Sequence, residues 1–530
     1  MRNFYAGAVG MYGRYSTSLA AFCFALGSVP SFAAVSGTWP DATETTRRAS
    51  GVKSAQDRLK QMGAKGWCGG MTPNDFKNRL SAKPTRLLMH HLYVGEALSV
   101  IIRTPSGKTI LYDGGIDWAG TDVIFPTLRD CYGTTKLDYI VLSHTHEDHY
   151  GGLPKFMYLW DAEPGHTIGK FYYPTLGVDG GRTLYDQVLA AAGPRAAIPE
   201  LGKNSFGLDP TLDKDLEINV VAVDGFVGAT KTTRVAELYK PLGSGGKSFA
   251  EDPYQKETLK DANASSIALA ITYKKFKYYV AGDVTSNNDS DHLAIEEAAA
   301  TYLEKSGFKA DVVVSSHHGS DTANSAIMLD ALDPQVVIVS TGYCNPARTE
   351  ATSWGSKTSC MGSGNGKGDS KGGYHLPDKP AIDRMLCLGA SAPDSSGKRK
   401  NCNVDNVFMT SPGNGKIQSP WVDVATSSFK PADPVKWPQY ASKVVASVRG
   451  ASAEELAANP NILTNNPDYT EGGDVLVEST GLSYIVTWGG EQKPKGWQKA
   501  GPGRVRPAGK EALLKLMTRS LPFAPPTLKK

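Results

Sequence analysis

Short apolar segments rich in β-branched residues alternate along the chain with segments of helical spacing, and this alternation predicts a mixed α/β fold. The clearest strand, residues 137–142, ends abruptly in a polar segment rich in histidine. Beyond the paired glycines at 151–152, residues 153–160 carry apolar side chains at helical spacing. We therefore expect the polar segment to lie where a strand leads into a helix, a position where rigid scaffolds often place reactive side chains.

The same patterns predict further elements on both sides of this point. Strands are expected at 86–94, 98–103, 109–115, 216–223, 265–273, 277–281, from 311, at 335–341, and in a closing hairpin at 473–478 and 483–488. Helices are expected at 55–62, 74–80, 122–131, 183–192 and 292–305. No internal repeat is present, so one large α/β domain with insertions fits the length of 530 residues.

The first 33 residues have the features of a secretory signal peptide. Arg2 and Arg14 precede an apolar run at 19–26, and the small residues Ser31 and Ala33 predict cleavage after Ala33. The run is too short to span a bilayer, and a buried helix is the alternative interpretation. The mature protein is expected to be soluble, without a membrane span, and secreted or periplasmic.

The remaining chain divides into three parts. Residues 34–85 are a polar lead-in, residues 86–490 form the main domain, and residues 491–530 form a basic tail with ten Lys/Arg against two acids. Polar insertions interrupt the domain near 225–260, 347–374 and 413–470. The tail is either a solvated segment or an electrostatic guide for a polyanion such as nucleic acid. The net charge of +4 is too small to imply a nucleic-acid or membrane partner by itself.

Cysteine usage agrees with export. Removal of the signal peptide removes Cys23 and leaves six cysteines, at 68, 131, 344, 360, 387 and 402. An even number of cysteines in an oxidising compartment predicts disulfides. The sequence has no Cys-x-x-Cys pair that would indicate a metal thiolate site. The sequence does not determine the pairing; Cys344–Cys360 and Cys387–Cys402 are the pairs that would close short loops.

The histidine-rich segment after strand 137–142 has the composition of a metal site. While the chain stays extended, His144, His146 and Asp148 face the same way, and His149 reaches a second point nearby. Imidazoles and carboxylates are ligands of zinc-like ions, and two adjacent points suggest two ions. A solvated polar loop is the alternative interpretation.

Two further strand exits carry ligand-type residues, Gly282-Asp283 and His317-His318-Gly319-Ser320, and Asp113-Gly114-Gly115 closes an earlier hairpin. In this order the motifs resemble those of the metallo-β-lactamase superfamily. More narrowly, the chain is similar to the extracytoplasmic hydrolase domain of ComEC-type competence DNA-uptake proteins. The narrower likeness also rests on Val94-Gly95, Pro105–Thr109, Asn263–Ile267 and the split loop Asn345-Pro346/His375-Leu376-Pro377.

The resemblance implies an αββα sandwich that holds two zinc ions at one edge, with manganese or another divalent ion as an alternative. His144 and His146 would hold one ion, and Asp283 would bridge the two. Asp148 and His149 would hold the other ion with one histidine of the 317/318 pair, assigned to His317.

The resemblance also implies roles beyond these ligands. Asp148, Asp283 and His318 form the implied catalytic set, in which His318 donates a hydrogen bond to the oxygen that gains charge. Asn263 takes the place of a third histidine at the first ion. Asp113, and His375 in a loop expected to line the site, complete the candidate residues.

The expected function is a secreted or periplasmic dinuclear zinc hydrolase of phosphate esters or phosphodiesters, acting through a hydroxide that bridges the ions. Its substrate would be a small molecule or a polyanion, with nucleic acid among the candidates. The alternatives are a lactonase or lactamase of the same fold, or a binding protein that kept the fold without activity.

Overall fold

The computed structural model describes residues 68–69, 71–83, 85–117, 119–174, 182–203, 206–229, 262–286, 293–341, 376–388, 403–410, 443–446, 473–488 and 498–500. The predicted signal peptide, the helix expected at 55–62, His375 and most of the three insertions lie outside the described residues. Of the predicted tail, 498–500 are described.

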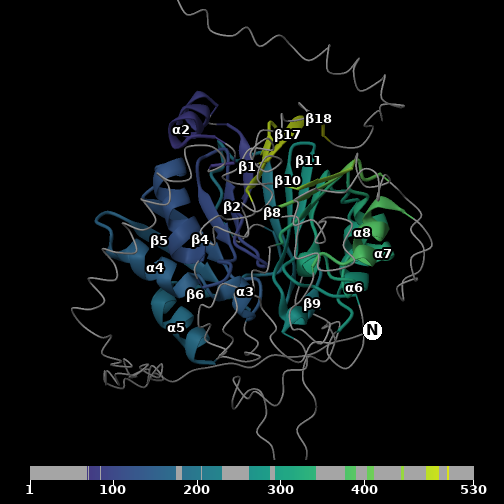
Figure 1. Cartoon of the computed structure of the whole chain (residues 1–530), viewed down its shortest axis with the longest axis horizontal. Helices are drawn as coiled ribbons and strands as arrows, with labels where there is room; N and C mark the ends of the chain where they lie inside the picture. The colour runs from purple at the N-terminus through teal and green to yellow at the C-terminus, as the bar shows by residue number, and fades with distance from the viewer. Residues whose placement is uncertain are drawn as a thin grey trace, which may run out of the picture. The chain divides into compact units, whose positions relative to one another are not determined.

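Two mixed β-sheets form the centre of the domain (Figure 1). The first sheet has the strand order β18-β17-β16-β1-β2-β3-β4-β5-β6. Its strands are β1 (Leu87–His91), β2 (Val100–Arg103), β3 (Thr109–Tyr112), β4 (Lys136–Val141), β5 (Thr167–Tyr172), β6 (Ala196–Ala197), β16 (Val475–Ser479), β17 (Ser483–Trp488) and β18 (Gln498–Lys499). Strands β3, β4, β5 and β6 are parallel to one another, whereas the other pairs are antiparallel.

The second sheet has the order β15-β14-β13-β12-β11-β10-β8-β7, and β9 pairs with β8. Its strands are β7 (Gly202–Lys203), β8 (Leu216–Val223), β9 (Phe226–Val227), β10 (Ala268–Tyr273), β11 (Phe276–Val280), β12 (Val312–Val314), β13 (Val336–Val339), β14 (Asn406–Met409) and β15 (Val444–Ala446). The run from β11 to β15 is parallel. The carboxyl ends of parallel strands from both sheets therefore supply the loops of the site.

Helices cover the outer face of each sheet, which confirms the predicted αββα sandwich (Figure 1). The first sheet is covered by α2 (Pro73–Ala82), α4 (Leu153–Ala162), α5 (Arg182–Ala192) and the π-helical segments η1 (Gly120–Ile124) and η2 (Thr127–Tyr132). The second is covered by α6 (Glu296–Lys305), α7 (Ala326–Leu332) and α8 (Lys379–Leu386). The short helices α3 (Glu147–Tyr150), η3 (Gly193–Arg195), η5 (Asn263–Ser265) and η6 (Ser316–Gly319) lie in the connections.

The period of the apolar residues explains this packing. In β1, Leu87 and Met89 face the core between the sheets, whereas Leu88 faces the helices, as alternation along a strand requires. In α4, Leu153, Phe156, Met157 and Trp160 are buried at positions i, i+3, i+4 and i+7, the stripe of an amphipathic helix. Side-chain spacing alone thus orients both elements, and α4 fixes the far end of the histidine-rich segment.

Several elements differ from the sequence-based expectation. The helix expected at 122–131 is present with two π-helical segments flanking Pro126, whose missing N–H weakens the regular pattern of helix hydrogen bonds. Strands β5 and β14 were not predicted, because β5 exposes three of its six residues and β14 has only four. Strand β15 lies within the range of the third predicted insertion, and β18 lies within the predicted tail.

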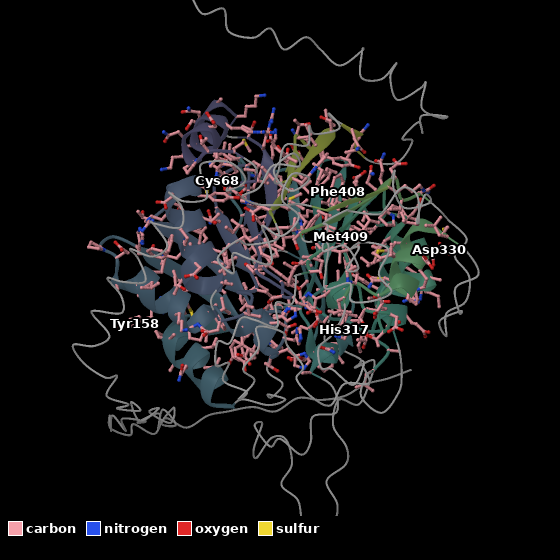
Figure 2. The ribbon with its side chains drawn as sticks, viewed as in Figure 1. Cys68, Tyr158, His317, Asp330, Phe408 and Met409 are labelled. Atoms are coloured by element: carbon pink, nitrogen blue, oxygen red, sulfur yellow. A yellow bond between two sulfur atoms is a disulfide. The ribbon has the colours of Figure 1, made fainter. Side chains whose placement is uncertain are left out.

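A disulfide joins Cys68 to Cys131, with the two Cα atoms 5.6 Å apart. It ties the start of the described chain to η2, at the end of the domain opposite to His317 in Figure 2. Cys387 is also disulfide-bonded, whereas Cys344, Cys360 and Cys402 lie outside the described residues. Among the helices of the described segments, none combines the length and the apolar character needed to cross a bilayer.

Candidate metal centre

Strand ends from both sheets converge on one cluster of histidine and aspartate side chains. Asp113 follows β3, the segment His144–His149 follows β4, Asp283 follows β11, and the pair His317–His318 follows β12. Ligand sites in α/β folds commonly lie at the carboxyl ends of parallel strands. Figure 1 shows α3, which contains Asp148 and His149, between the two halves of the sandwich.

Four of these residues form a closed group of potential ligand atoms: Asp148, His149, Asp283 and His318. The Nε2 atoms of His149 and His318 are 3.2 Å apart. His149 Nε2 lies 3.2 Å from Asp283 Oδ1, and His318 Nε2 lies 3.1 Å from Asp148 Oδ2. Two imidazoles and two carboxylates at these distances match the donor set of a tetrahedral zinc-like ion.

A second group consists of His144, His146 and the same Asp283. His144 Nε2 lies 3.0 Å from His146 Nδ1 and 3.7 Å from Asp283 Oδ2. This group has three potential ligand atoms where the other has four, and it shares one residue with it. The two groups together could hold two neighbouring cations, and the group of His144, His146 and Asp283 would have room for one further ligand such as water or substrate.

Asp113 and Ser143 orient the imidazoles from behind. Asp113 Oδ2 accepts hydrogen bonds from His149 Nδ1 at 2.8 Å and from Ser143 Oγ at 2.7 Å, and Oδ1 accepts one from Ser143 N at 2.6 Å. Ser143 Oγ lies 3.1 Å from His144 Nδ1, so it can accept a hydrogen bond from that ring. Both rings then present Nε2 to the centre. Carboxylates and hydroxyls behind metal-binding histidines commonly orient the rings in this way.

The two consecutive histidines after β12 have different surroundings. His318 is 3% exposed, and its Nδ1 donates to the carbonyl oxygen of Ser340, 2.9 Å away. His317 Nδ1 lies 2.9 Å from Thr322 Oγ1, and its Nε2 lies 3.9 Å from Asp283 Oδ2. Both residues adopt left-handed backbone angles, with φ of 49° and 52°. Such angles are costly for side chains other than glycine and concentrate at functional sites.

Gly282 brings Asp283 against the histidine segment. Its φ is +56°, and a Cβ at this position would lie 2.6 Å from Ser143 Cβ. Any larger residue would push the end of β11 away from the end of β4. A glycine is therefore required for Asp283 to reach the ligands that come from the first sheet.

Charges within the centre are strongly coupled. Burial by itself raises the pKa of Asp283, but the facing imidazoles, led by His149, outweigh it and hold the pKa well below its ordinary value. Burial lowers the pKa of His149, but the carboxylates of Asp283, Asp148 and Asp113 outweigh that and hold it well above its ordinary value. Burial followed by the charge of His149 lowers the pKa of His144. The centre thus concentrates opposite charges that a divalent cation can reorganise.

The structure brings together most of the residues expected from the sequence, but it exchanges the places of the two adjacent histidines. His318 lies among the four ligand atoms, whereas His317, which was assigned to the metal, lies outside both groups. Left-handed backbone angles at both residues end the extended course of β12, so strand alternation does not predict which of the two rings joins the group. Asn263 is 4% exposed at the start of η5. His375 lies outside the described residues.

Three contributors were not identified from the sequence: Ser143, Thr322 and Ser340. Ser143 had a local signal, since it directly precedes the histidine motif at the end of β4. Thr322 and Ser340 had none, because Thr322 contacts His317 through the turn after β12 and Ser340 contacts His318 from the end of β13. Hydroxyl and carbonyl groups of this kind are recognisable only after the sheets are assembled.

Comparisons with known proteins agree with this geometry. The model of the metallo-beta-lactamase superfamily matches residues 92–235. The chain is 34% identical over 82 residues to protein YcaI of Escherichia coli strain K12, across 15% of this chain and 10% of YcaI. It is 25% identical over 252 residues to the competence protein ComA of Neisseria gonorrhoeae, across 47% of this chain and 26% of ComA. The chain therefore spans about a tenth and a quarter of the lengths of these two relatives.

Among solved structures, the short form of human tRNase Z aligns at 12% identity with a TM-score of 0.27, over 48% of this chain and 93% of that one. The family match contains the segment His144–His149, and the second sheet adds Asp283 and His318 to the same cluster. Residues 92–235 therefore match the metallo-beta-lactamase superfamily, and the αββα sandwich carries the site of a metal-dependent hydrolase.

Proposed function

We propose that this protein is an exported hydrolase of phosphate esters and phosphodiesters, with nucleic acid among its substrates, and that it works with two zinc ions. The observation that carries the proposal is the sharing of Asp283 between a group of four ligand residues and a group of three. Two-metal sites of this kind are common among phosphatases and nucleases. The likeness to the hydrolase domain of competence proteins supports the same substrate class.

The residues present fit a pair of cations. Asp283 Oδ1 is buried and makes no hydrogen bond within the described part of the chain, although it lies 3.2 Å from His149 Nε2. Ring nitrogens of His149 and His318 face each other at 3.2 Å, an arrangement that a shared ligand stabilises better than a hydrogen bond does. Bound divalent cations supply a water of lowered pKa and positive charge for the oxygens of the substrate.

The chain's own residues set up the rest of the reaction. Asp113 and Ser143 keep His149 and His144 in the tautomer that presents Nε2. His317 is 18% exposed, and its Nδ1 is oriented by Thr322. Its Nε2 side faces the centre without being one of the grouped ligand atoms. It is placed to donate a hydrogen bond to a phosphoryl oxygen as negative charge increases there, the role that the sequence analysis gave to His318.

The test is a substrate panel on purified full-length protein. An aryl phosphodiester, an aryl phosphomonoester, single- and double-stranded DNA, a chromogenic lactam and a lactone are compared before and after chelation and zinc repletion. We expect zinc-dependent turnover of phosphoesters, loss of turnover in Asp283→Asn, and wild-type turnover in the surface control Glu297→Gln.

Two outcomes would change the assigned function, and a third would exclude a role of the tail. Turnover of the lactam or lactone without any phosphoester would favour the alternative hydrolase. Bound metal without turnover of any substrate would favour a binding protein that kept the fold. DNA cleavage that does not weaken with added salt would exclude a guiding role for the basic tail, because phosphate contacts are strongly salt-dependent.

Export has a separate test. Sequencing the amino terminus of protein from its native compartment should find a chain that begins at Ala34, because cleavage is expected after Ala33. A mature protein that retains Met1 would contradict the export proposal and leave the catalytic proposal intact.

A further inference from the structure

The turn between β12 and α7, which carries the two adjacent histidines, is held by the side chain of Asn324. Its Oδ1 accepts hydrogen bonds from Ser316 N at 3.1 Å and from Ser315 Oγ at 3.0 Å. Its Nδ2 donates to the carbonyl oxygen of Ser316 at 3.0 Å and to that of Ser320 at 3.5 Å. The amide therefore contacts the chain on both sides of the histidine pair.

The hydrogen-bonding capacity of this amide is fully used inside the protein. Asn324 is 3% exposed and has a φ of 59°. An asparagine side chain can accept two hydrogen bonds and donate two, and this one makes all four. Asparagine also enters the left-handed region more readily than most residues do. Asparagine therefore suits both the backbone angle and the hydrogen bonds at this position.

Two charged side chains from neighbouring helices fix the backbone around Asn324. Glu296, the first residue of α6, is 1% exposed and accepts from Asn324 N and Ser325 N, each at 2.8 Å. Arg384 in α8 donates to the carbonyl oxygen of Asn324 at 3.2 Å and to that of Ala323 at 2.9 Å. Because α6 and α8 pack on the second sheet, these contacts fix the turn relative to the strands that lead into the metal centre.

The turn needs this support because both histidines have left-handed backbone angles. Such angles are unfavourable for side chains other than glycine and persist where surrounding contacts enforce them. His318 offers a ligand atom to the group of four, and His317 Nε2 lies 3.9 Å from Asp283 Oδ2. Without the Asn324 amide, the backbone can relax towards ordinary angles, and both rings would then move.

We propose that Asn324 is a positioning residue of the metal centre, which keeps His318 aligned with the cation and His317 aligned with the substrate. It acts through these two histidines rather than by contact with the substrate. The part of the role that concerns His317 rests on the phosphoester hydrolysis proposed above, in which His317 donates to an oxygen that gains charge. An interaction made in the transition state affects kcat more than KM.

Asn324→Gly removes all four hydrogen bonds of the amide and suits the left-handed backbone angle. We expect zinc affinity, measured by chelator competition, to fall about 10–100-fold. At saturating zinc, kcat for an aryl phosphodiester should fall about 10–100-fold, whereas KM should stay within about threefold. The visible spectrum of the cobalt(II)-substituted protein reports the geometry of the imidazole ligands, so it should also change.

Two controls separate positioning from a general loss of stability. Leu303→Ala leaves a cavity behind α6, at a side chain that is 1% exposed, and should lower the urea midpoint without changing zinc affinity, the cobalt spectrum or kcat. Glu296→Gln keeps the Asn324 amide but weakens its backbone support, so it should cause a smaller loss of the same kind. The exposed neighbour Glu297→Gln should cause no loss.

The results that would overturn the role of Asn324 are distinct from those that would overturn the proposed function. Wild-type zinc affinity, cobalt spectrum and kcat in Asn324→Gly would overturn the role, and so would equal losses in Leu303→Ala. If Asn324→Gly does not fold, identical behaviour of Glu296→Gln and Glu297→Gln would overturn it. A zinc-loaded wild-type protein that cleaves no phosphoester would overturn the proposed function, whereas zinc affinity and the cobalt spectrum would still test the alignment of His318.

Discussion

His91 should make the stability of this fold fall as the solution becomes acidic. It is the last residue of β1, fully buried between the two sheets, and its Nε2 lies 3.4 Å from the hydroxyl oxygen of Tyr278 on β11. Its Nδ1 has no hydrogen-bond partner in the described part of the chain. Burial, and then the neighbouring His90, lower the pKa of His91 from 6.5 to about 3.

The size of the effect follows from proton linkage. Below pH 6.5 the unfolded chain takes up a proton at His91, whereas the folded protein does not until about pH 3. The unfolded state therefore binds more protons in this window, and the free energy of unfolding falls as pH falls. From about pH 7.5 to about pH 5, the His91 contribution is a loss of about 2 kcal/mol.

Urea denaturation of wild type and His91→Leu at several pH values measures this term. The substitution also removes a partner of Tyr278 and alters packing, but those costs do not depend on pH in this range. Between about pH 7.5 and about pH 5, the free energy of unfolding of wild type should therefore fall by about 2 kcal/mol more than that of His91→Leu. Tyr278→Phe keeps His91 and should follow the wild-type slope. Parallel curves for wild type and His91→Leu would refute the reasoning.

Four further predictions concern the metal centre and the disulfides. Elemental analysis should find about two zinc-like ions per mature chain and a clear loss of metal in Asp283→Ala and Asp148→Ala. The circular dichroism spectra of both variants should stay native. Normal metal content in both variants would disprove the ligand assignment. Asp113→Asn weakens the acceptor of His149 Nδ1, so zinc affinity measured by chelator competition should fall about 10–100-fold, and Asp117→Asn serves as a control at an exposed ion pair. The Cys68–Cys131 bond closes a separation of 63 residues, so Cys131→Ser should reduce the free energy of unfolding by about 4 kcal/mol in denaturant titrations. Thiol titration of the denatured, unreduced wild type should find few free groups, and six would contradict both this disulfide and the export proposal.

Much of the fold and the metal motif was predictable because it depends on local patterns. The apolar run of β4 and the helical stripe of α4 place the segment His144–His149 at a strand exit, and the ligand types predict a metal site without any tertiary information. Asp283 was recognisable for the same reason, as an acid directly after an apolar strand.

Other features required the assembled sandwich. The choice between His317 and His318 depends on two left-handed backbone angles, which their sequence does not specify. The short strands β5 and β14 have weak patterns and are stabilised by parallel pairing to β4 and β13. Cysteine spacing does not encode the Cys68–Cys131 pairing, since α2 and η2 must first pack together. The sequence alone determined the spacing of apolar residues in the strands and helices and the metal-binding residue types. Tertiary packing decided which of those side chains share a buried, low-dielectric centre and which charges they carry there.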